Sequence, residues 1–207
     1  MAQGDLSVEI KSNLLRGKKI ALCVTGSIGA VECVKLGREL RRFGAEIDAY
    51  MTPSAQKFIT PTSLEWATAG KVITDFTPTA EHIVQADLVL VAPATLHTIN
   101  KIALGFADSV VTTTIASAWG QRLPIVFVPA MHQSLSHNPV LERNLAVLKQ
   151  DPHLFFLEPK WEEGKAKFLD IETIVSFVSH RLHEKDKLSG KKIVITAGPT
   201  IEPIDPV

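Results

Sequence analysis

The chain has little cysteine, no excess of charge and no long apolar run. Its 207 residues include 2 cysteines, and Lys plus Arg equals Asp plus Glu at 22 each. Cys23 falls in an expected strand and Cys33 in an expected helix, which excludes a disulfide framework and a cysteine-rich zinc site. Balanced charge excludes a global field that would attract nucleic acid or an anionic membrane. The most apolar stretches, such as residues 86–94 and 123–131, are too short to span a bilayer.

The N-terminus also lacks the pattern of a signal peptide. The opening sequence MAQGDLSVEI does not have the basic-then-apolar order of a signal peptide. Together with the sparse cysteines, this favours a reduced, cytoplasmic protein. The length is enough for one sizeable domain and the start of another.

Apolar runs typical of strands alternate with segments whose apolar residues have helical spacing. Strands are expected at 18–26, 45–52, 86–94, 123–130 and 153–159, and helices at 30–44, 62–70, 95–120, 138–150 and 170–185. The helical segment 95–120 is either two helices or one interrupted helix. This alternation predicts an α/β protein with a Rossmann-like (flavodoxin-like) three-layer fold, in which a parallel β-sheet is flanked by helices. Ligands of such sheets bind at the carboxyl ends of the strands.

One sequence recurs in outline near the end of the chain. GKKIALCVTGS begins at Gly17, and GKKIVITAGPT begins at Gly190 after the charged segment HRLHEKDKLSG. The second copy predicts the opening of a second Rossmann-like domain, and the alternative is a last strand of the first sheet. The expected divisions are an N-terminal extension at 1–17, a first Rossmann-like domain at 18–184, and a linker with the truncated start of a second domain at 185–207.

Hydroxyl side chains follow three of the expected strands. The first loop, TGSIGA, has glycines and a serine that can expose backbone N–H groups to a phosphate at a helix N-terminus. The second strand ends with Thr52 and Ser54 instead of the acidic residue that a dinucleotide ribose requires. Thr95 and Thr98 follow the third strand. These loops favour a phosphate or mononucleotide pocket, and the alternative for Thr52 and Ser54 is that they only cap a helix.

Three histidines are candidates for chemistry. His82 lies just before the third strand, His97 in the hydroxyl loop, and His132 in VPAMHQSL. His132 has His137 five residues on, but no carboxylate or cysteine joins these histidines at a recognised ligand spacing. We therefore expect no metal site. Spacing alone leaves His82 either a structural residue or a catalytic one.

Four motifs together resemble a known family. TGSIGA, HIVQAD, APATLHTINKIALGFADSVVTT and VPAMHQSL occur in this order and resemble the flavin-dependent cysteine decarboxylases. The tail ITAGPTIEPIDPV is similar to the start of a phosphopantothenate–cysteine ligase. The resemblance implies FMN-dependent decarboxylation of 4′-phosphopantothenoylcysteine to 4′-phosphopantetheine in coenzyme A biosynthesis. It also implies a thioaldehyde intermediate, flavin that is reduced and then reoxidised, and a ligase domain in the full-length chain.

The resemblance also implies roles for individual residues. His82 matches the family's catalytic base, and Met131 and His132 stand where relatives hold the substrate. Lys165, in the segment that closes over the substrate, is expected to bind it. The residues expected to bind FMN are Gly26, Ser27, Ile28, Thr52, Ser54, Thr95, Leu96, His97, Thr98 and Ala130.

This sequence departs from the family's pattern in four places. His132 and His97 replace asparagines, Leu135 replaces a methionine, and the closing segment EPKWEEGKAKFLD has no cysteine. The family's cysteine supplies the last proton, so the proton donor is left open. We hypothesise that His132 serves as this acid. By location, the other candidates are Lys165, Glu162 and Glu163, whose alternative is a solvated charged loop.

Three other functions remain open at the level of sequence. The first is an oxidative peptidyl-cysteine decarboxylase, which stops at the enethiol and needs no protonating cysteine. The second is a non-catalytic flavin-binding regulatory subunit, and the third is a plain nucleotide-binding Rossmann domain. The resemblance implies a homotrimer or dodecamer with the flavin at a subunit interface, a small-molecule substrate, and neither nucleic acid nor membrane as a partner.

Overall fold

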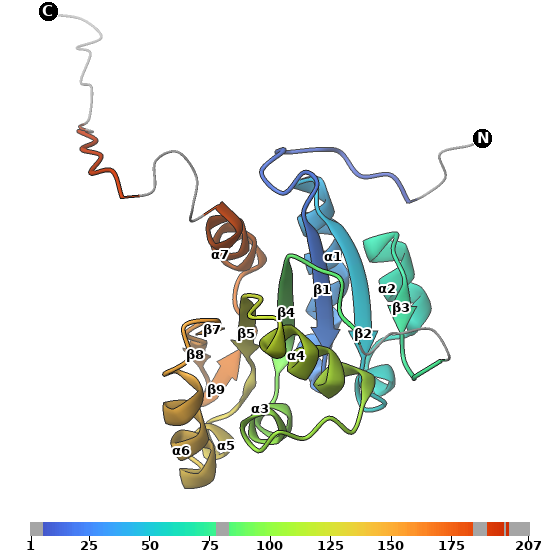
Figure 1. The fold of residues 1–207 in the computed structure, drawn as a ribbon, viewed down its shortest axis with the longest axis vertical. Coiled ribbons are helices and arrows are strands. Elements are labelled where there is room, and N and C mark those ends of the chain that lie inside the picture. The colour runs from blue at the N-terminus through green and yellow to red at the C-terminus, as the bar shows by residue number, and fades with distance from the viewer. Residues whose placement is uncertain (1–5, 78–82, 184–189, 197, 199–207) are drawn as a thin grey trace, which may run out of the picture.

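A computed structural model of the chain describes residues 6–77, 83–183, 190–196 and 198. Its centre is a six-stranded parallel sheet of order β3-β2-β1-β4-β5-β7, as Figure 1 shows. The strands are β1 (Lys19–Val24), β2 (Glu46–Met51), β3 (Val72–Ile73), β4 (Leu88–Ala94), β5 (Ile125–Pro129) and β7 (Leu154–Phe156). The order is that of a doubly wound Rossmann sheet, so the expected fold class is confirmed.

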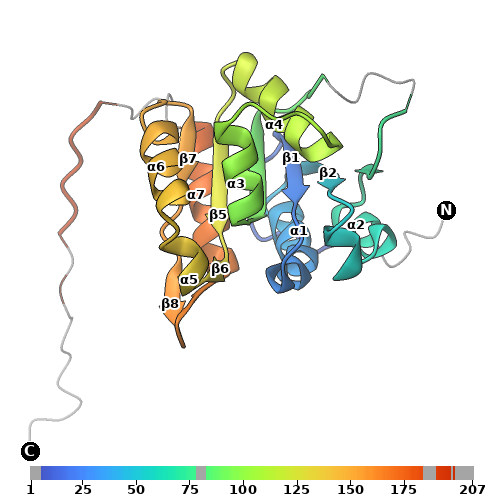
Figure 2. The same ribbon diagram turned by 90° about the horizontal axis from the view of Figure 1, so that it is seen from below.

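Helices cover both faces of the sheet. One face carries α1 (Glu32–Arg42), α2 (Pro61–Thr68) and α7 (Ile171–His183), and the other carries α3 (Leu96–Ala103), α4 (Val110–Gly120) and α6 (Pro139–Leu148). Figure 2 shows α1 and α4 on opposite sides of β1. Two 3₁₀ helices, η1 (Ile28–Val31) and η2 (Ala55–Lys57), follow the loops after β1 and β2. The chain therefore forms three layers.

The strand residues divide between two apolar cores. In β1, Leu22 and Val24 pack in the core under α1 and α7, while Ala21 and Cys23 pack in the core under α3, α4 and α6. Every residue of β4 is buried. Burial on both faces explains why these strands are continuous apolar runs in the sequence instead of alternating with polar residues.

The long helical segment after β4 forms two helices. The break lies between α3 and α4, where Gly105 adopts a left-handed conformation with φ 74°. Ser109 then starts α4 with a capping box: its hydroxyl accepts the N–H of Thr112, and Thr112 accepts the N–H of Ser109. The reciprocal cap satisfies two backbone donors, so the sequence restarts a helix at this point.

A second, smaller sheet was not predicted. It is antiparallel, of order β6-β9-β8, and consists of β6 (Met131–His132), β9 (Lys165–Lys167) and β8 (Lys160–Glu162). The closing segment thus forms a hairpin whose two-residue turn has positive φ at both Glu163 (51°) and Gly164 (69°). Such angles are those of a type I′ turn, which matches the twist of paired strands. A short helix, α5 (Gln133–Ser136), follows β6.

The sheet topology determines where a ligand can bind. The chain runs from β1 to β2 and β3 at one side of the sheet, and then returns to β4 beside β1. The carboxyl ends of β1 and β4 therefore flank the switch point, which is the usual binding crevice of such sheets. The described residues 190–196 and 198 belong to neither sheet, and the expected division into domains stays a prediction. No helix in the described part of the chain is long and apolar enough to cross a membrane.

Candidate functional site

A cleft of about 680 Å³ lies at the carboxyl ends of β1, β2, β4 and β5. It collects most residues that the sequence assigned to cofactor and substrate. These are Gly26, Ser27, Thr52, Ser54, Thr95, Leu96, His97, Thr98, Ala130, Met131 and His132. Loops far apart in the sequence therefore meet at one site, which we call the cofactor cleft.

The loops after β1 and β2 are in close contact at Gly26. A Cβ at this position would lie 2.4 Å from the Cβ of Ser54, which no real side chain tolerates. Next to it, the Ser27 hydroxyl accepts the N–H of Gly29 at 3.2 Å and caps η1. Glycine is thus required at Gly26 because the second loop approaches so closely.

A chain of hydroxyls crosses the switch point. Thr25 Oγ1 donates to the carbonyl oxygen of Pro93 at 2.6 Å and lies 3.3 Å from Thr95 Oγ1. Thr95 Oγ1 in turn lies 3.2 Å from Thr98 Oγ1. Thr95 makes no side-chain cap to α3 as a result. The first backbone N–H groups of α3 therefore have no hydroxyl cap, which is the condition in which a helix start binds an anion.

Thr52 and Ser54 have different local roles. Thr52 Oγ1 accepts the N–H of Ala55 at 3.2 Å, so the expected alternative of a capping role holds for Thr52. Ser54 makes no side-chain capping bond to η2. Both residues line the cofactor cleft, and the Ser54 hydroxyl is the more available of the two for a ligand.

Five further residues line this cleft and were not predicted: Pro53, Lys101, Ser109, Thr112 and Leu135. Lys101 follows Thr98 by one helical turn on α3, and residues at that spacing share a helix face. This spacing is the signal that could have identified Lys101. Ser109 and Thr112 have the three-residue spacing of a capping box, which is also readable in sequence.

A second cleft of about 900 Å³ adjoins the first. The two share Ser27, Ala130, Met131 and His132 as a common wall. The predicted residues Ile28 and Lys165 line only this second cleft, which we call the hairpin cleft because β9 forms one side. Its apolar lining includes Val31 and Phe168. The structure therefore divides the predicted site into two adjoining parts.

His132 lies where the clefts meet, and its ring is fixed at one nitrogen. Its Nδ1 accepts the backbone N–H of Ser134 at 3.3 Å and lies 3.0 Å from the Ser134 hydroxyl. The neutral ring therefore carries its proton on Nε2. His132 pairs with Lys165 across the β6–β9 ladder, which places the two side chains on the same face of this sheet.

The hairpin carries a charged network around Glu162. Glu162 contacts Lys160 at 2.8 Å and Lys167 at 2.7 Å, and Glu163 lies 3.4 Å from Lys167. Hydrogen bonds from Lys160 and Lys167 lower the pKa of Glu162 to about 2. Glu162 is therefore ionised at neutral pH and is a poor proton donor. Lys165 forms no ion pair with another described residue.

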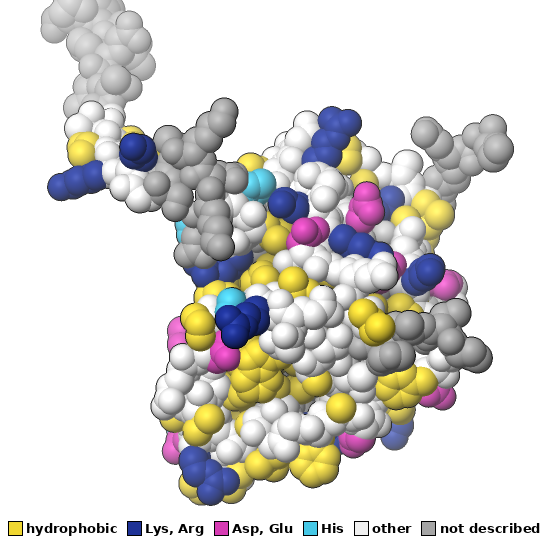
Figure 3. Space-filling view, viewed as in Figure 1, with side chains coloured by type: hydrophobic (Ala, Val, Ile, Leu, Met, Phe, Trp, Pro, Cys, Tyr) yellow, Lys and Arg dark blue, Asp and Glu magenta, His cyan; other side chains and the backbone are white. Residues whose placement is uncertain are grey.

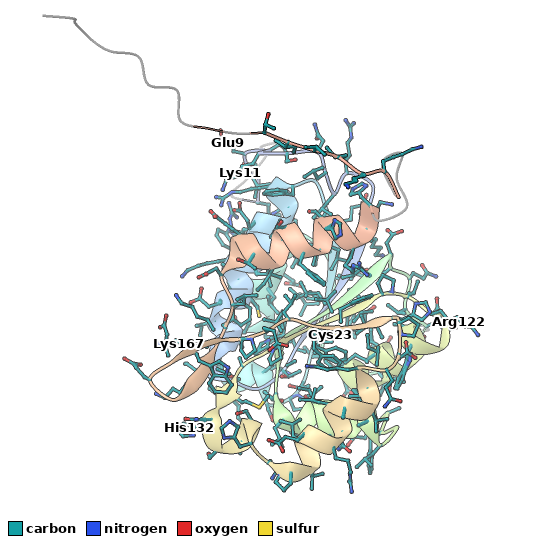
Figure 4. All side chains as sticks on the ribbon, turned by 90° about the vertical axis from the view of Figure 1, so that its left-hand side faces the viewer. Glu9, Lys11, Cys23, Arg122, His132 and Lys167 are labelled. Carbon is teal, nitrogen blue, oxygen red and sulfur yellow. The ribbon has the colours of Figure 1, made fainter. Side chains whose placement is uncertain are left out.

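Neither cysteine is placed to replace the one that the closing segment lacks. Cys23 and Cys33 are fully buried, and burial raises the pKa of both thiols. The Cys33 thiol donates to the carbonyl oxygen of Ala92 at 3.0 Å. Figure 4 shows Cys23 in the interior and His132 and Lys167 together on one side of the molecule. Both thiols are structural, because they are buried and belong to neither cleft lining.

His82, the predicted base, lies outside the described residues. The segment after it is anchored on α4. The N–H of Val84 donates to Ser117 Oγ at 3.3 Å, and Gln121 Nε2 donates to the Val84 carbonyl oxygen at 3.2 Å. Over the described ranges, no group of three His, Cys, Asp or Glu side chains is arranged to hold a metal ion.

Proteins similar in sequence match nearly the whole chain. The chain is 48% identical over 204 residues to the coenzyme A biosynthesis bifunctional protein CoaBC of Thermococcus kodakarensis, covering 95% of this chain and 50% of that protein. The protein of the same name from Methanocaldococcus jannaschii is 39% identical over 200 residues, covering 95% of this chain and 49% of that one. The chain thus spans about half the length of these relatives.

Two solved structures have a fold similar to that of this chain. The FMN-dependent cysteine decarboxylase SpaF has a TM-score of 0.71 at 27% identity, over 80% of this chain and 97% of that one. A mutant PPC decarboxylase complexed with pantothenoylaminoethenethiol has a TM-score of 0.69 at 26% identity, over 79% of this chain and 97% of that one.

The family model described as Flavoprotein matches residues 8–183. That range contains the six-stranded sheet, both clefts and the hairpin. The resemblance read from the four sequence motifs is therefore confirmed at the level of the family, and the chain belongs to the Flavoprotein family.

Proposed function

We propose that this chain is an FMN-dependent decarboxylase that converts 4′-phosphopantothenoylcysteine to 4′-phosphopantetheine in coenzyme A biosynthesis. The observation that carries the proposal is the pair of adjoining clefts, one lined by hydroxyls at the switch point and one beside it for a second ligand. Relatives named for coenzyme A biosynthesis that match 95% of this chain support the choice of substrate.

The residues of the cofactor cleft fit FMN. Hydroxyls, helix starts and one lysine line it, and no carboxylate is among its described lining residues. Such a set of donors suits a phosphate and a polyhydroxyl chain. We infer that Ser27, Ser54, Thr95 and Thr98 would hold the cofactor, with Ala130 against it. Bound FMN would supply a two-electron acceptor. The cysteine of the substrate needs one, because loss of its carboxylate as CO₂ would otherwise leave a carbanion with no electron sink.

His132 is proposed to hold the substrate and to supply the last proton. In the neutral ring Nδ1 accepts the N–H of Ser134, so Nε2–H can donate a hydrogen bond to a substrate carboxylate, amide or thiolate. Transfer of the Nε2 proton requires the imidazolium form, whose Nδ1–H can donate to the Ser134 hydroxyl 3.0 Å away and which returns to neutral imidazole. Met131 lies beside it in β6 and lines both clefts. Lys165 is opposite His132 and forms no ion pair with another described residue, and we propose that it binds an anionic part of the substrate. The role of His82 as the base that takes the thiol proton remains a prediction.

Other functions weighed from the sequence are not favoured. The missing cysteine in the hairpin is the feature that suggests an oxidative decarboxylase releasing an enethiol, or a flavin-binding subunit without activity. Against both stands the identity of 35–48% to proteins named CoaBC. The plain nucleotide-binding domain is excluded as a complete description, because the chain belongs to the Flavoprotein family.

The whole protein is proposed to be a bifunctional cytoplasmic enzyme. The residues after α7 are proposed to lead into a phosphopantothenate–cysteine ligase domain, since the relatives matched are about twice as long as the matched region. We also propose a homotrimer or dodecamer. Exposed apolar side chains at Leu104 (62%) and Phe106 (51%) support self-association near α3. Figure 3 shows exposed hydrophobic side chains on the face that carries α3 and α4.

The proposed function is tested by the absorption spectrum of the purified protein and by release of CO₂. We expect flavin bands, and CO₂ from 4′-phosphopantothenoylcysteine without added oxidant. A colourless protein would contradict the proposal that the chain binds FMN. A flavin-containing protein that releases no CO₂ would favour a regulatory subunit without activity. Light scattering of the same sample checks the oligomer, and a monomer would contradict that part.

A further inference from the structure

The cofactor cleft has one lysine, and no other Lys, Arg, Asp or Glu is among its described lining residues. Lys101 reaches the cleft from the last turn of α3. The rest of the lining is made of hydroxyls, apolar groups, a glycine and the imidazoles of His97 and His132. Only 26% of the Lys101 side chain is exposed, so its ammonium group is held at the wall instead of moving freely in solvent. A fixed cation in such a lining favours an anionic ligand.

The loop before α4 holds Lys101 in place. Its ammonium group forms an ion pair with Asp108, whose other oxygen accepts the hydroxyl of Thr112 at 3.3 Å. Thr112 is in turn locked into the capping box of α4 by Ser109. The hydrogen bond from Lys101 lowers the pKa of Asp108, so the carboxylate stays ionised at neutral pH. An ammonium group has three donors, and one carboxylate leaves donors available for a ligand.

We propose that Lys101 binds the phosphate of the cofactor and thereby makes this cleft select FMN over riboflavin. The inference rests on the proposed function, because it takes FMN as the ligand. Hydroxyl groups can donate to the ribityl chain of either flavin as well as to a phosphate, whereas the charge of a lysine favours only the flavin that carries the phosphate, because riboflavin is FMN without that group. A charge-assisted hydrogen bond to phosphate is roughly twice as strong as one between neutral groups. Asp108 is a positioning residue that acts through Lys101.

A purely structural role for Lys101 makes a different prediction. If the ion pair only fastened α3 to the start of α4, its loss would lower the melting temperature and weaken both flavins together. If Lys101 binds the phosphate, its loss lowers the affinity for FMN and does not change the affinity for riboflavin. The ratio of the two affinities therefore separates the two roles, and it does not depend on enzymatic activity.

The experiment titrates flavin-depleted protein with FMN and, separately, with riboflavin, following flavin fluorescence. We expect Lys101→Gln to weaken FMN by about tenfold or more and riboflavin by less than about twofold. Lys101→Arg keeps the charge and is expected to retain most of the FMN affinity. Lys57→Gln is the matched control, because Lys57 is an exposed lysine on η2 beside the cleft and does not line it. This control is expected to change neither affinity.

Two results would overturn the inference: unchanged FMN affinity in Lys101→Gln, or equal losses for both flavins. Failure of the proposed function looks different, because the unaltered protein would then bind no FMN. If Lys101→Gln does not fold, Lys101→Met repeats the test, since methionine keeps the length and the helix propensity of lysine. Melting curves of all variants show which of them are folded.

Discussion

At Gly26 and His132 the properties of the site depend on single residues. Gly26 lies where two loops meet with no space for a Cβ, and His132 lies on the wall that both clefts share. Gly26 determines how closely the two loops of the cofactor cleft approach, and His132 provides an imidazole that lines both clefts. Substitutions at these two positions should therefore affect binding and proton transfer separately.

Gly26→Ala is expected to weaken FMN binding. The added methyl group would lie 2.4 Å from the Ser54 Cβ, so one of the two loops must move. Overpacking of this kind costs about 1–3 kcal/mol. Titration with FMN and a melting curve measure the effect. Gly120→Ala is the control, because a Cβ at Gly120 meets nothing within 4 Å. Normal FMN affinity in Gly26→Ala would contradict the fit of the cofactor to this loop.

His132→Asn tests the last proton. Asparagine can still form hydrogen bonds with the substrate, but it has no proton to donate as an acid, so decarboxylation continues while the final step slows. We expect kcat to fall by about 10²-fold, the usual contribution of a general acid. His137→Asn is the control, because His137 lines neither the cofactor cleft nor the hairpin cleft. Full turnover in His132→Asn would end the proposed role as acid.

Among the elements, the strands and helices of the large sheet were predictable and the small sheet was not. Apolar runs such as β4 are buried on both faces, which leaves a strong pattern in the sequence. The strands of the small sheet have two or three residues each, and β8 and β9 are rich in lysine and glutamate. Such segments are too short to show alternation. Their pairing depends on a turn at Glu163 and Gly164, which lacks the usual Asn-Gly signal.

The site residues, too, were predictable only where a local sequence pattern marks them. Serine and threonine after strand ends were recognisable, because the carboxyl edge of a parallel sheet gathers them. Lys101 was missed because its side chain reaches the cleft from within a helix, and no loop motif marks it. Lys165, which the resemblance linked to the substrate, lines the hairpin cleft, and the sequence did not reveal that this cleft is separate from the cofactor cleft. Its position depends on β9 pairing with β6, a contact between distant segments.

The hairpin should respond to acid through Glu162. Because its folded pKa of about 2 lies below the ordinary value of 4.5, its ion pairs stabilise the hairpin above pH 4.5 and are lost as the pH falls towards about 2. Trp161 in β8 is 48% exposed and reports on this region by fluorescence. We expect its acid transition to disappear in Glu162→Gln. An identical transition in that variant would show that other groups are responsible.

For the molecule as a whole, one topological feature organises the function. The order β3-β2-β1-β4-β5-β7 opens a crevice beside β1 and β4, and the antiparallel hairpin closes over the neighbouring cleft. The large sheet therefore forms the cofactor cleft, and the small sheet carries the residues that we propose contact the substrate. This division agrees with a reaction in which the cofactor stays bound through many turnovers, while a new substrate molecule binds and its product leaves at each turnover.

The proposed reaction is the decarboxylation of 4′-phosphopantothenoylcysteine without net oxidation. It is tested most directly by the mass of the product formed under anaerobic conditions, measured together with the flavin absorbance. We expect 4′-phosphopantetheine over many turnovers, with the flavin oxidised at the end. A product lacking two hydrogen atoms, formed once per flavin as the absorbance bleaches, would contradict it.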